Sequence, residues 1–190
     1  MKKALILVAL ALSLSVPVQP VMAAELPFTI IAGDVLQITV WKEEGMDREV
    51  VVLPNGDITF PLVGTVNVQG FTPEDVQDVI KDKLKNYIPD ASVAVSVKAA
   101  LGHTVNVVGQ VGRPGEIIIN RRMTTLQALS QAGGLTPFAD EDDIIVIRRR
   151  GNQNISIPVP YGDIVSGHKL DRDITLEPGD VIVVPTASLF

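Results

Sequence analysis

The sequence contains no cysteine, only two histidines and few aromatic residues. Without cysteine the chain forms neither disulfides nor thiolate metal sites, so an exported domain of this size depends on its hydrophobic core for stability. Acidic residues outnumber basic ones, and the formal net charge of −6 argues against nucleic acid as a partner. No segment after the N-terminal residues is apolar over a length that could span a bilayer.

Residues 1–23 have the pattern of a secretory signal peptide. Two lysines precede an apolar run over residues 4–16, which is well short of the ~20 residues that a membrane-spanning helix needs. A small-x-small site ends at Ala23, so we expect cleavage there, with Ala24 as the rival position and a retained membrane anchor as the alternative. Because no cysteine follows the apolar run, we expect an exported protein without a lipid anchor.

A Gly-Asp pair occurs near both ends of the remaining chain. Gly33-Asp34 and Gly179-Asp180 each lead directly into a strand rich in β-branched residues. Glycine permits a positive φ and aspartate can bond its neighbouring backbone, so each pair predicts a tight turn before a strand. We expect the two pairs to lie near each other, with a first strand over residues 30–41 pairing with or neighbouring the sheet of the second half. A turn-forming role for both aspartates is favoured over a catalytic one.

Residues 27–98 predict several short strands and one main helix. Asn55-Gly56, followed by Asp57, is typical of a type I′ hairpin turn, and Pro61 and Gly64 interrupt the chain after the next strand. Thr72 is a favourable N-cap, and apolar residues then recur at helical spacing: Val76, Val79, Ile80 and Leu84.

The second half, over residues 103–185, also predicts short strands with one helix. Pro114-Gly115 indicates a turn, and Gly133-Gly134 ends a short helix over residues 126–132. A further hairpin is expected around residues 151–154. This order of strands, hairpin and helix suits a β-grasp arrangement, so the fold class expected for the whole chain is α+β.

Taken in order, these motifs resemble the outer-membrane polysaccharide export family. Residues 31–97 resemble its polysaccharide export domain, and residues 104–185 resemble the SLBB domain, a soluble ligand-binding β-grasp module. The matching phrases are Gly33-Asp34 with Val40-Trp41, Pro54 to Gly64, Gly70 to Glu74, Val108 to Val111, Arg113 to Gly115, Ala132 to Gly134, and Gly179 to Ile182. The short length and the phrase Gly134 to Ala139 are most similar to the smaller members associated with exosortase/PEP-CTERM systems.

The resemblance implies a β-rich export domain with one main helix, over residues 27–98, an SLBB domain over residues 103–185, and a tail over residues 186–190. It implies a passive conduit or adaptor for exopolysaccharide, without catalysis or cofactor, that forms a homo-oligomeric ring. It also implies an inner-membrane chain-length regulator or tyrosine kinase as a partner. Larger members carry a lipidated cysteine and a terminal amphipathic helix. This sequence shows neither, so we expect a separate outer-membrane barrel and a periplasmic location at the outer membrane.

Two other classes of function stay open. One is a periplasmic sugar-binding β-grasp module with no role in translocation. Self-association separates the two candidates, because a conduit must form a ring. The other is a carbohydrate-active enzyme, which would need paired carboxylates ~5–10 Å apart in a cleft.

Arginines are the best candidates for contact with polysaccharide or a partner: Arg121, Arg122, Arg148, Arg149 and Arg150. Charged strand ends that discourage edge pairing are the more conservative interpretation. We interpret His103 and His168 as surface residues and Trp41 as a core residue, although Trp41 could stack on a sugar. The acidic run over residues 140–143 lacks the ligand spacing of a calcium loop, so we expect no metal there.

Overall fold

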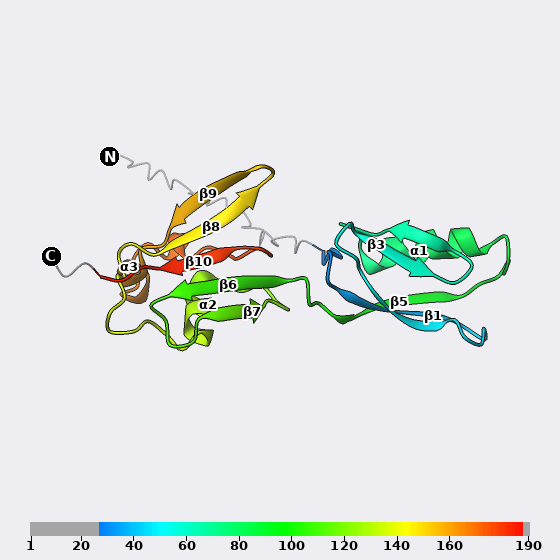
Figure 1. The fold of residues 1–190 in the computed structure, drawn as a ribbon, viewed down its shortest axis with the longest axis horizontal. Helices are drawn as coiled ribbons and strands as arrows, with labels where there is room; N and C mark the ends of the chain where they lie inside the picture. Colours follow the sequence, from blue (N-terminus) through cyan, green and yellow to red (C-terminus); the bar gives the residue numbers. More distant parts are fainter. Residues whose placement is uncertain (1–26, 188–190) are drawn as a thin grey trace, which may run out of the picture.

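The structure is a computed structural model that describes residues 27–187. Two units follow one another end to end along the long axis of the molecule, each with its own sheet and hydrophobic core (Figure 1). The α+β fold class, with one main helix in the first unit, is confirmed. The expected signal peptide and its cleavage site lie outside the described residues. Within residues 27–187, no helix has both the length and the hydropathy needed to cross a membrane.

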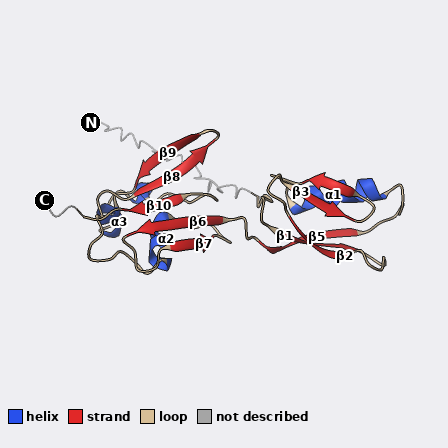
Figure 2. Ribbon diagram, viewed as in Figure 1, coloured by secondary structure: helices blue, strands red, loops and turns tan. Residues whose placement is uncertain are grey.

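The first unit contains a three-stranded sheet, a separate hairpin and the main helix (Figure 2). Its elements are β1 (Val35–Val40), β2 (Asp47–Val51), β3 (Asp57–Phe60), β4 (Gly64–Asn67), α1 (Pro73–Leu84) and β5 (Val93–Ala99). The antiparallel sheet has the order β2-β1-β5, and β3 pairs with β4.

The main helix, α1, begins with a capping box. Thr72 Oγ1 accepts a hydrogen bond from the Asp75 backbone amide, and the Asp75 carboxylate accepts one from the Thr72 amide in return. Its buried residues recur at helical spacing and join the core of the first unit: Val76, Ile80 and Leu84. The helix expected from the apolar pattern is therefore confirmed.

The expectation that the first strand joins the sheet of the second half was wrong. Strand β1 lies in the centre of its own sheet, where both of its edges are paired, one with β2 and one with β5. Its buried positions, Leu36, Ile38 and Val40, pack into the core of the first unit. A strand with both edges paired has no hydrogen-bonding groups left for a second sheet.

The Asn55-Gly56 turn also differs from the expectation. Gly56 has a positive φ but Asn55 does not, so the turn is not type I′. The Gly56 amide donates to the Leu53 carbonyl, and the following strand, β3, pairs with β4 rather than with β2. Asn67 from β4 holds the turn by donating to the Asp57 carboxylate and to the Asn55 carbonyl.

The second unit is a five-stranded mixed sheet with helix α2 packed into the same core. Its elements are β6 (Thr104–Gly109), β7 (Gly115–Ile118), α2 (Thr125–Gln131), β8 (Ile145–Arg150), β9 (Gln153–Pro158), α3 (Tyr161–Val165), a 3₁₀ turn (Leu170–Arg172) and β10 (Val181–Val184). The order is β7-β6-β10-β8-β9, with β10 parallel to β6. The expected hairpin around residues 151–154 is confirmed, and it extends away from the rest of the unit (Figure 1).

Candidate functional site

The two Gly-Asp turns have the same hydrogen-bond pattern. In each turn the aspartate amide donates to the carbonyl three residues earlier, Ile31 for Asp34 and Glu177 for Asp180. The amide of that earlier residue donates back to the carboxylate, at 3.0 Å in the first turn and 2.8 Å in the second. Both aspartates are buried. Each side chain therefore closes its own turn and keeps a second oxygen for another contact.

Asp34 uses that second oxygen to join the two units. Its Oδ1 accepts a hydrogen bond of 3.0 Å from the amide of Gly102, in the connection that leads into β6. Its Oδ2 lies 3.2 Å from His103 Nε2, which is itself buried. The backbone of Gly102 lies so close to the Asp34 turn that a Cβ on Gly102 would stand 2.3 Å from the Ala32 carbonyl oxygen.

Asp180 uses its carboxylate to bind Arg148. Arg148 Nε and Nη2 donate to its two oxygens at 2.9 and 2.6 Å, and Nη2 also donates to the Thr175 carbonyl. The hydrogen bonds that Arg148 donates to Asp180 are the main reason that the pKa of Arg148 is raised, although burial acts against them. Arg148 therefore stays charged, and its guanidinium is bound inside the domain by Asp180 and the Thr175 carbonyl.

Glu177 completes this network at the surface. Arg148 Nη1 donates to Glu177 Oε1 at 2.6 Å, and Arg150 contacts both oxygens at 2.7 Å. The carboxylate of Glu177 is thus held between two guanidinium groups.

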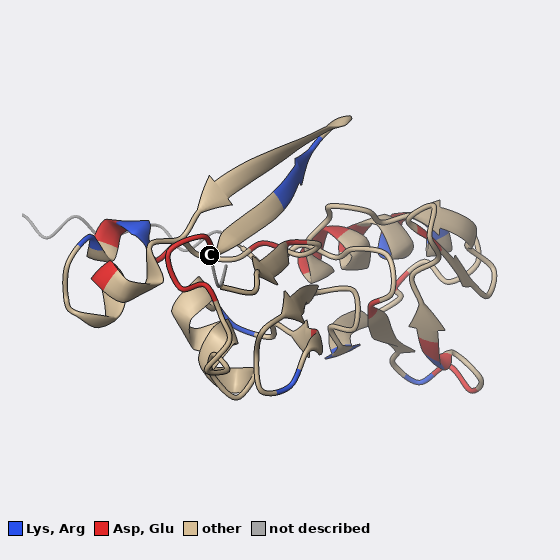
Figure 3. Ribbon diagram, turned by 60° about the vertical axis from the view of Figure 1, so that its left-hand side comes forward, with Lys and Arg blue, Asp and Glu red and all other residues tan. Residues whose placement is uncertain are grey.

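The structure does not place Arg148, one of the arginines named as candidates for ligand contact, at the surface. Arg148 is only 8% exposed, because it shares the inward face of β8 with Val146. Arg150 is bound to Glu177, and Arg149 lies on the projecting hairpin, where basic residues mark β8 in Figure 3.

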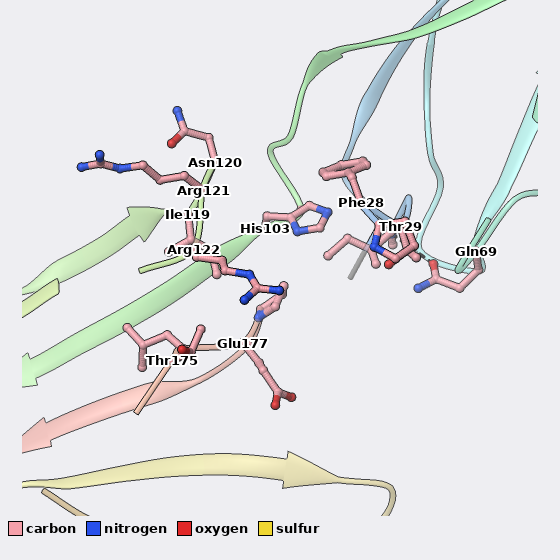
Figure 4. A pocket seen from close by; sticks show the side chains of 17 residues that line it. Phe28, Thr29, Gln69, His103, Ile119, Asn120, Arg121, Arg122, Thr175 and Glu177 are labelled. Carbon is pink, nitrogen blue, oxygen red and sulfur yellow. Dashed lines mark hydrogen bonds between the residues drawn. The ribbon is translucent and has the colours of Figure 1, made fainter. Parts of the chain in front are cut away.

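A groove lies where the two units meet, with a volume of about 1040 Å³. The first unit contributes Phe28 and Gln69, and the second contributes Arg121, Arg122 and Glu177 (Figure 4). Both Gly-Asp turns border it, through residues 31–32 on one side and 178–179 on the other.

An aromatic pair forms part of the wall. The rings of Phe28 and His103 stack with their centroids 4.6 Å apart and their planes at 30°. Phe28 remains 39% exposed. His103 is largely covered, with 12% of its side chain exposed, so its interpretation as a surface residue was wrong. His168 is exposed.

Arg121 and Arg122 are exposed at the groove. Among residues 27–187, neither guanidinium takes part in an ion pair or a side-chain hydrogen bond with a described residue. Figure 4 shows Arg122 directed toward His103 and Arg121 directed away from it. Of the five arginines named as candidates from the sequence, these two are the ones at the groove.

The other residues singled out from the sequence have local roles in this structure. Pro61 lies in the β3–β4 turn and Pro114 precedes β7. The glycines of these motifs all have a positive φ: Gly33, Gly56, Gly64, Gly115, Gly133, Gly134 and Gly179. In the acidic run the Asp142 amide donates to Asp140, and no group of three or more metal-ligating side chains occurs in the part of the chain that the structure describes.

The interpretation of Trp41 as a core residue was wrong, because it is 69% exposed. The buried positions of β1 are Leu36, Ile38 and Val40, so the next residue lies on the opposite face. Its backbone amide donates to the carbonyl of Ser92, the residue just before β5.

Two family comparisons cover most of the chain. The family "Polysaccharide biosynthesis/export protein" matches residues 23–98, and the family "SLBB domain" matches residues 103–184. The two matches fall on the two units described above.

Several curated proteins are similar to this chain. "EPS I polysaccharide export outer membrane protein EpsA" of Ralstonia nicotianae is 29% identical over an alignment of 192 residues, which covers 88% of this chain and 49% of that protein. "Capsule polysaccharide export outer membrane protein CtrA" of Neisseria meningitidis is 27% identical over 177 residues, 83% of this chain and 44% of that protein. "Polysialic acid transport protein KpsD" of Escherichia coli is 30% identical, over 83% of this chain and 28% of that protein.

The chain spans about half, or less, of the length of these relatives. Its two units nevertheless match two domains in the order expected from the sequence, and the relatives are all named as export or transport proteins for polysaccharides. The chain therefore belongs to the outer-membrane polysaccharide export family, with a polysaccharide biosynthesis/export domain followed by an SLBB domain.

Proposed function

We propose that this protein is a periplasmic polysaccharide export protein, a passive conduit or adaptor through which exopolysaccharide reaches the cell surface. The observation that carries the proposal is the match of both units, in order, to the two domain families. The relatives are named for the export of EPS I, of capsule and of polysialic acid. The role proposed here is therefore export itself, and not one particular polymer.

The proposal places the protein in the periplasm at the outer membrane, exported by the signal peptide and not lipidated. The basic start, apolar run and small-x-small site support this location. The names of the relatives, which include two outer-membrane proteins, also support it.

We propose that the protein works as a homo-oligomeric ring between two other proteins, an inner-membrane chain-length regulator or tyrosine kinase and a separate outer-membrane barrel. Large apolar side chains that stay exposed in the single chain support self-association, because aromatic residues are enriched at protein interfaces. Trp41, Tyr87 and Phe138 are the most exposed aromatic residues of the described part of the chain.

The proposal includes no catalysis. A conduit needs neither a nucleophile nor a general base. The carboxylate at the groove, Glu177, is bound by two arginines, Arg148 and Arg150, which occupy both of its oxygens.

A periplasmic sugar-binding module without a translocation role is the second candidate, and the groove between the two units favours it. The two candidates differ in assembly and in phenotype. We expect the purified protein to form a ring, alone or with its partners, and we expect a deletion strain to synthesise polysaccharide that it does not export. Normal export in the deletion strain, with a protein that stays monomeric beside both partners, would favour the binding module.

A further inference from the structure

We propose that the groove between the two domains binds an acidic sugar unit, a saccharide that carries a carboxylate, and that Arg122 supplies the main charge contact with Arg121 at the rim. The source of the ligand, the exported polysaccharide, rests on the proposed function. The inference about the chemistry of the groove rests on its own residues.

The groove carries a charge opposite in sign to that of the whole protein. The protein as a whole is acidic, with a formal net charge of −6. At the groove, however, Glu177 is neutralised by Arg148 and Arg150. Arg121 and Arg122 keep guanidinium groups that no described side chain neutralises. A cationic groove in an acidic protein favours an anionic ligand, and arginine binds carboxylates in a bidentate geometry.

The wall of the groove combines apolar side chains with a few polar ones. Apolar residues from both domains line the groove beside the arginines: Phe28, Ile119, Leu176 and Pro178. Gln69 lies on the opposite side from Arg122 (Figure 4). A pocket that is mostly apolar with a few polar groups is the usual form of a small-ligand site. A sugar ring fits it, because the ring presents apolar C–H faces as well as polar groups.

Contacts between the two domains hold part of the groove wall in place. The groove lies next to the contact of Asp34 with Gly102, and His103 is packed between Asp34 and the Phe28 ring. A ligand that touches Phe28 and Arg122 together would contact both domains. Residues fixed by these contacts need little ordering on binding, which favours affinity.

The test uses the mature protein and two oligosaccharides that differ only in charge. Oligogalacturonate carries a carboxylate on each unit, and its methyl ester is the uncharged match. We expect calorimetric or NMR titration to show binding of the acid and about tenfold weaker binding of the ester. Binding of the acid should also weaken at high salt, because screening reduces exposed charge pairs.

Variants locate the site. Arg122→Ala should weaken binding of the acid by about tenfold, and Arg121→Ala should weaken it less. Arg122→Lys should recover part of the affinity. Arg149→Ala removes an exposed arginine outside the groove and serves as the matched control, with unchanged affinity. Thermal melting of each variant shows that a loss of binding is not a loss of fold.

Three outcomes would overturn the inference. The first is equal binding of the acid and its ester, and the second is unchanged binding by the Arg121→Ala/Arg122→Ala variant. The third is that substitution of Arg121 or Arg122 abolishes self-association but leaves sugar binding unchanged, which would make the groove a contact with a neighbouring copy of the chain. If a deletion strain fails to export polysaccharide while the groove binds neither sugar, the proposed function stands and this inference fails. If export is normal while the groove binds the acid, the proposed function fails and the site remains.

Discussion

Arg148 and Asp180 form a buried bidentate ion pair that ties β8 to the turn before β10, with Nε–Oδ1 and Nη2–Oδ2 distances of 2.9 and 2.6 Å. The same aspartate closes its own turn through the Glu177 amide. One carboxylate thus links a turn to the neighbouring strand of the sheet.

Removing Arg148 should be strongly destabilising. Arg148→Met leaves Asp180 as a buried charge without its partner, and losses of this kind cost about 3–5 kcal/mol. Denaturant unfolding of the two proteins measures the difference. Arg149→Met is the matched control on the same strand, and its cost should stay below about 0.5 kcal/mol because its side chain is exposed. Equal effects of the two substitutions would contradict a structural role for Arg148.

Two glycine substitutions should have opposite signs. Gly102→Ala places a Cβ 2.3 Å from the Ala32 carbonyl oxygen and 2.8 Å from Ile31 Cγ1, so it should destabilise by about 1–3 kcal/mol. Gly162→Ala lies within α3, where its Cβ makes only ordinary contacts, so it should stabilise by up to about 1 kcal/mol. Melting temperatures of both variants test this. A harmless Gly102→Ala would mean that the two domains do not approach as closely as the structure has them.

The single tryptophan gives a direct test of exposure. Trp41 is 69% exposed, so its fluorescence in the folded protein should be quenched efficiently by iodide, almost as in the unfolded chain. Trp41→Phe should change stability by less than about 0.5 kcal/mol. Protection of Trp41 from iodide at high protein concentration, but not at low concentration, would place it in a contact between subunits. Protection at every concentration would contradict its exposed position.

The capping box of α1 predicts a pH-dependent contribution to stability. Hydrogen bonds from the amide and hydroxyl of Thr72 hold the pKa of Asp75 below its usual value of 3.8. A lowered folded-state pKa stabilises the fold above the unfolded pKa, and this stabilisation is lost as the pH falls through the lowered value. Wild type should therefore be more stable than Asp75→Asn near neutral pH, and the difference should shrink below pH 3.8. A difference that is constant with pH would contradict this.

The alternation of side chains along β1 and β8 predicts the positions of Trp41 and Arg148 better than residue type does. Leu36, Ile38 and Val40 fix the buried face of β1, so the parity of Trp41 already points it outward. Ile144 and Val146 fix the buried face ahead of Arg148 in the same way. In both cases the strand period, and not the type of side chain, decides on which face of the strand the residue lies.

Other features depend on long-range pairing and have no local signal. The helix α1 was predictable because its N-cap and apolar spacing lie within one segment. The choice of β5 as the second partner of β1 is set by packing between segments far apart in the chain, since more than fifty residues separate the two strands. The groove is of the same kind, since Phe28 and Arg122 meet only after both domains have folded. The resemblance to the smaller exosortase-associated members stays a prediction.

The most direct test of the central claim is the distribution of polysaccharide in a strain that lacks this protein. Surface and cell-retained polymer are measured separately, in the deletion strain and in the same strain complemented with the wild-type chain. We expect the deletion to remove surface polysaccharide while polymer still accumulates inside the cell, and the wild-type chain to restore export. Normal surface polysaccharide in the deletion strain, or a loss of synthesis itself, would contradict a role in export.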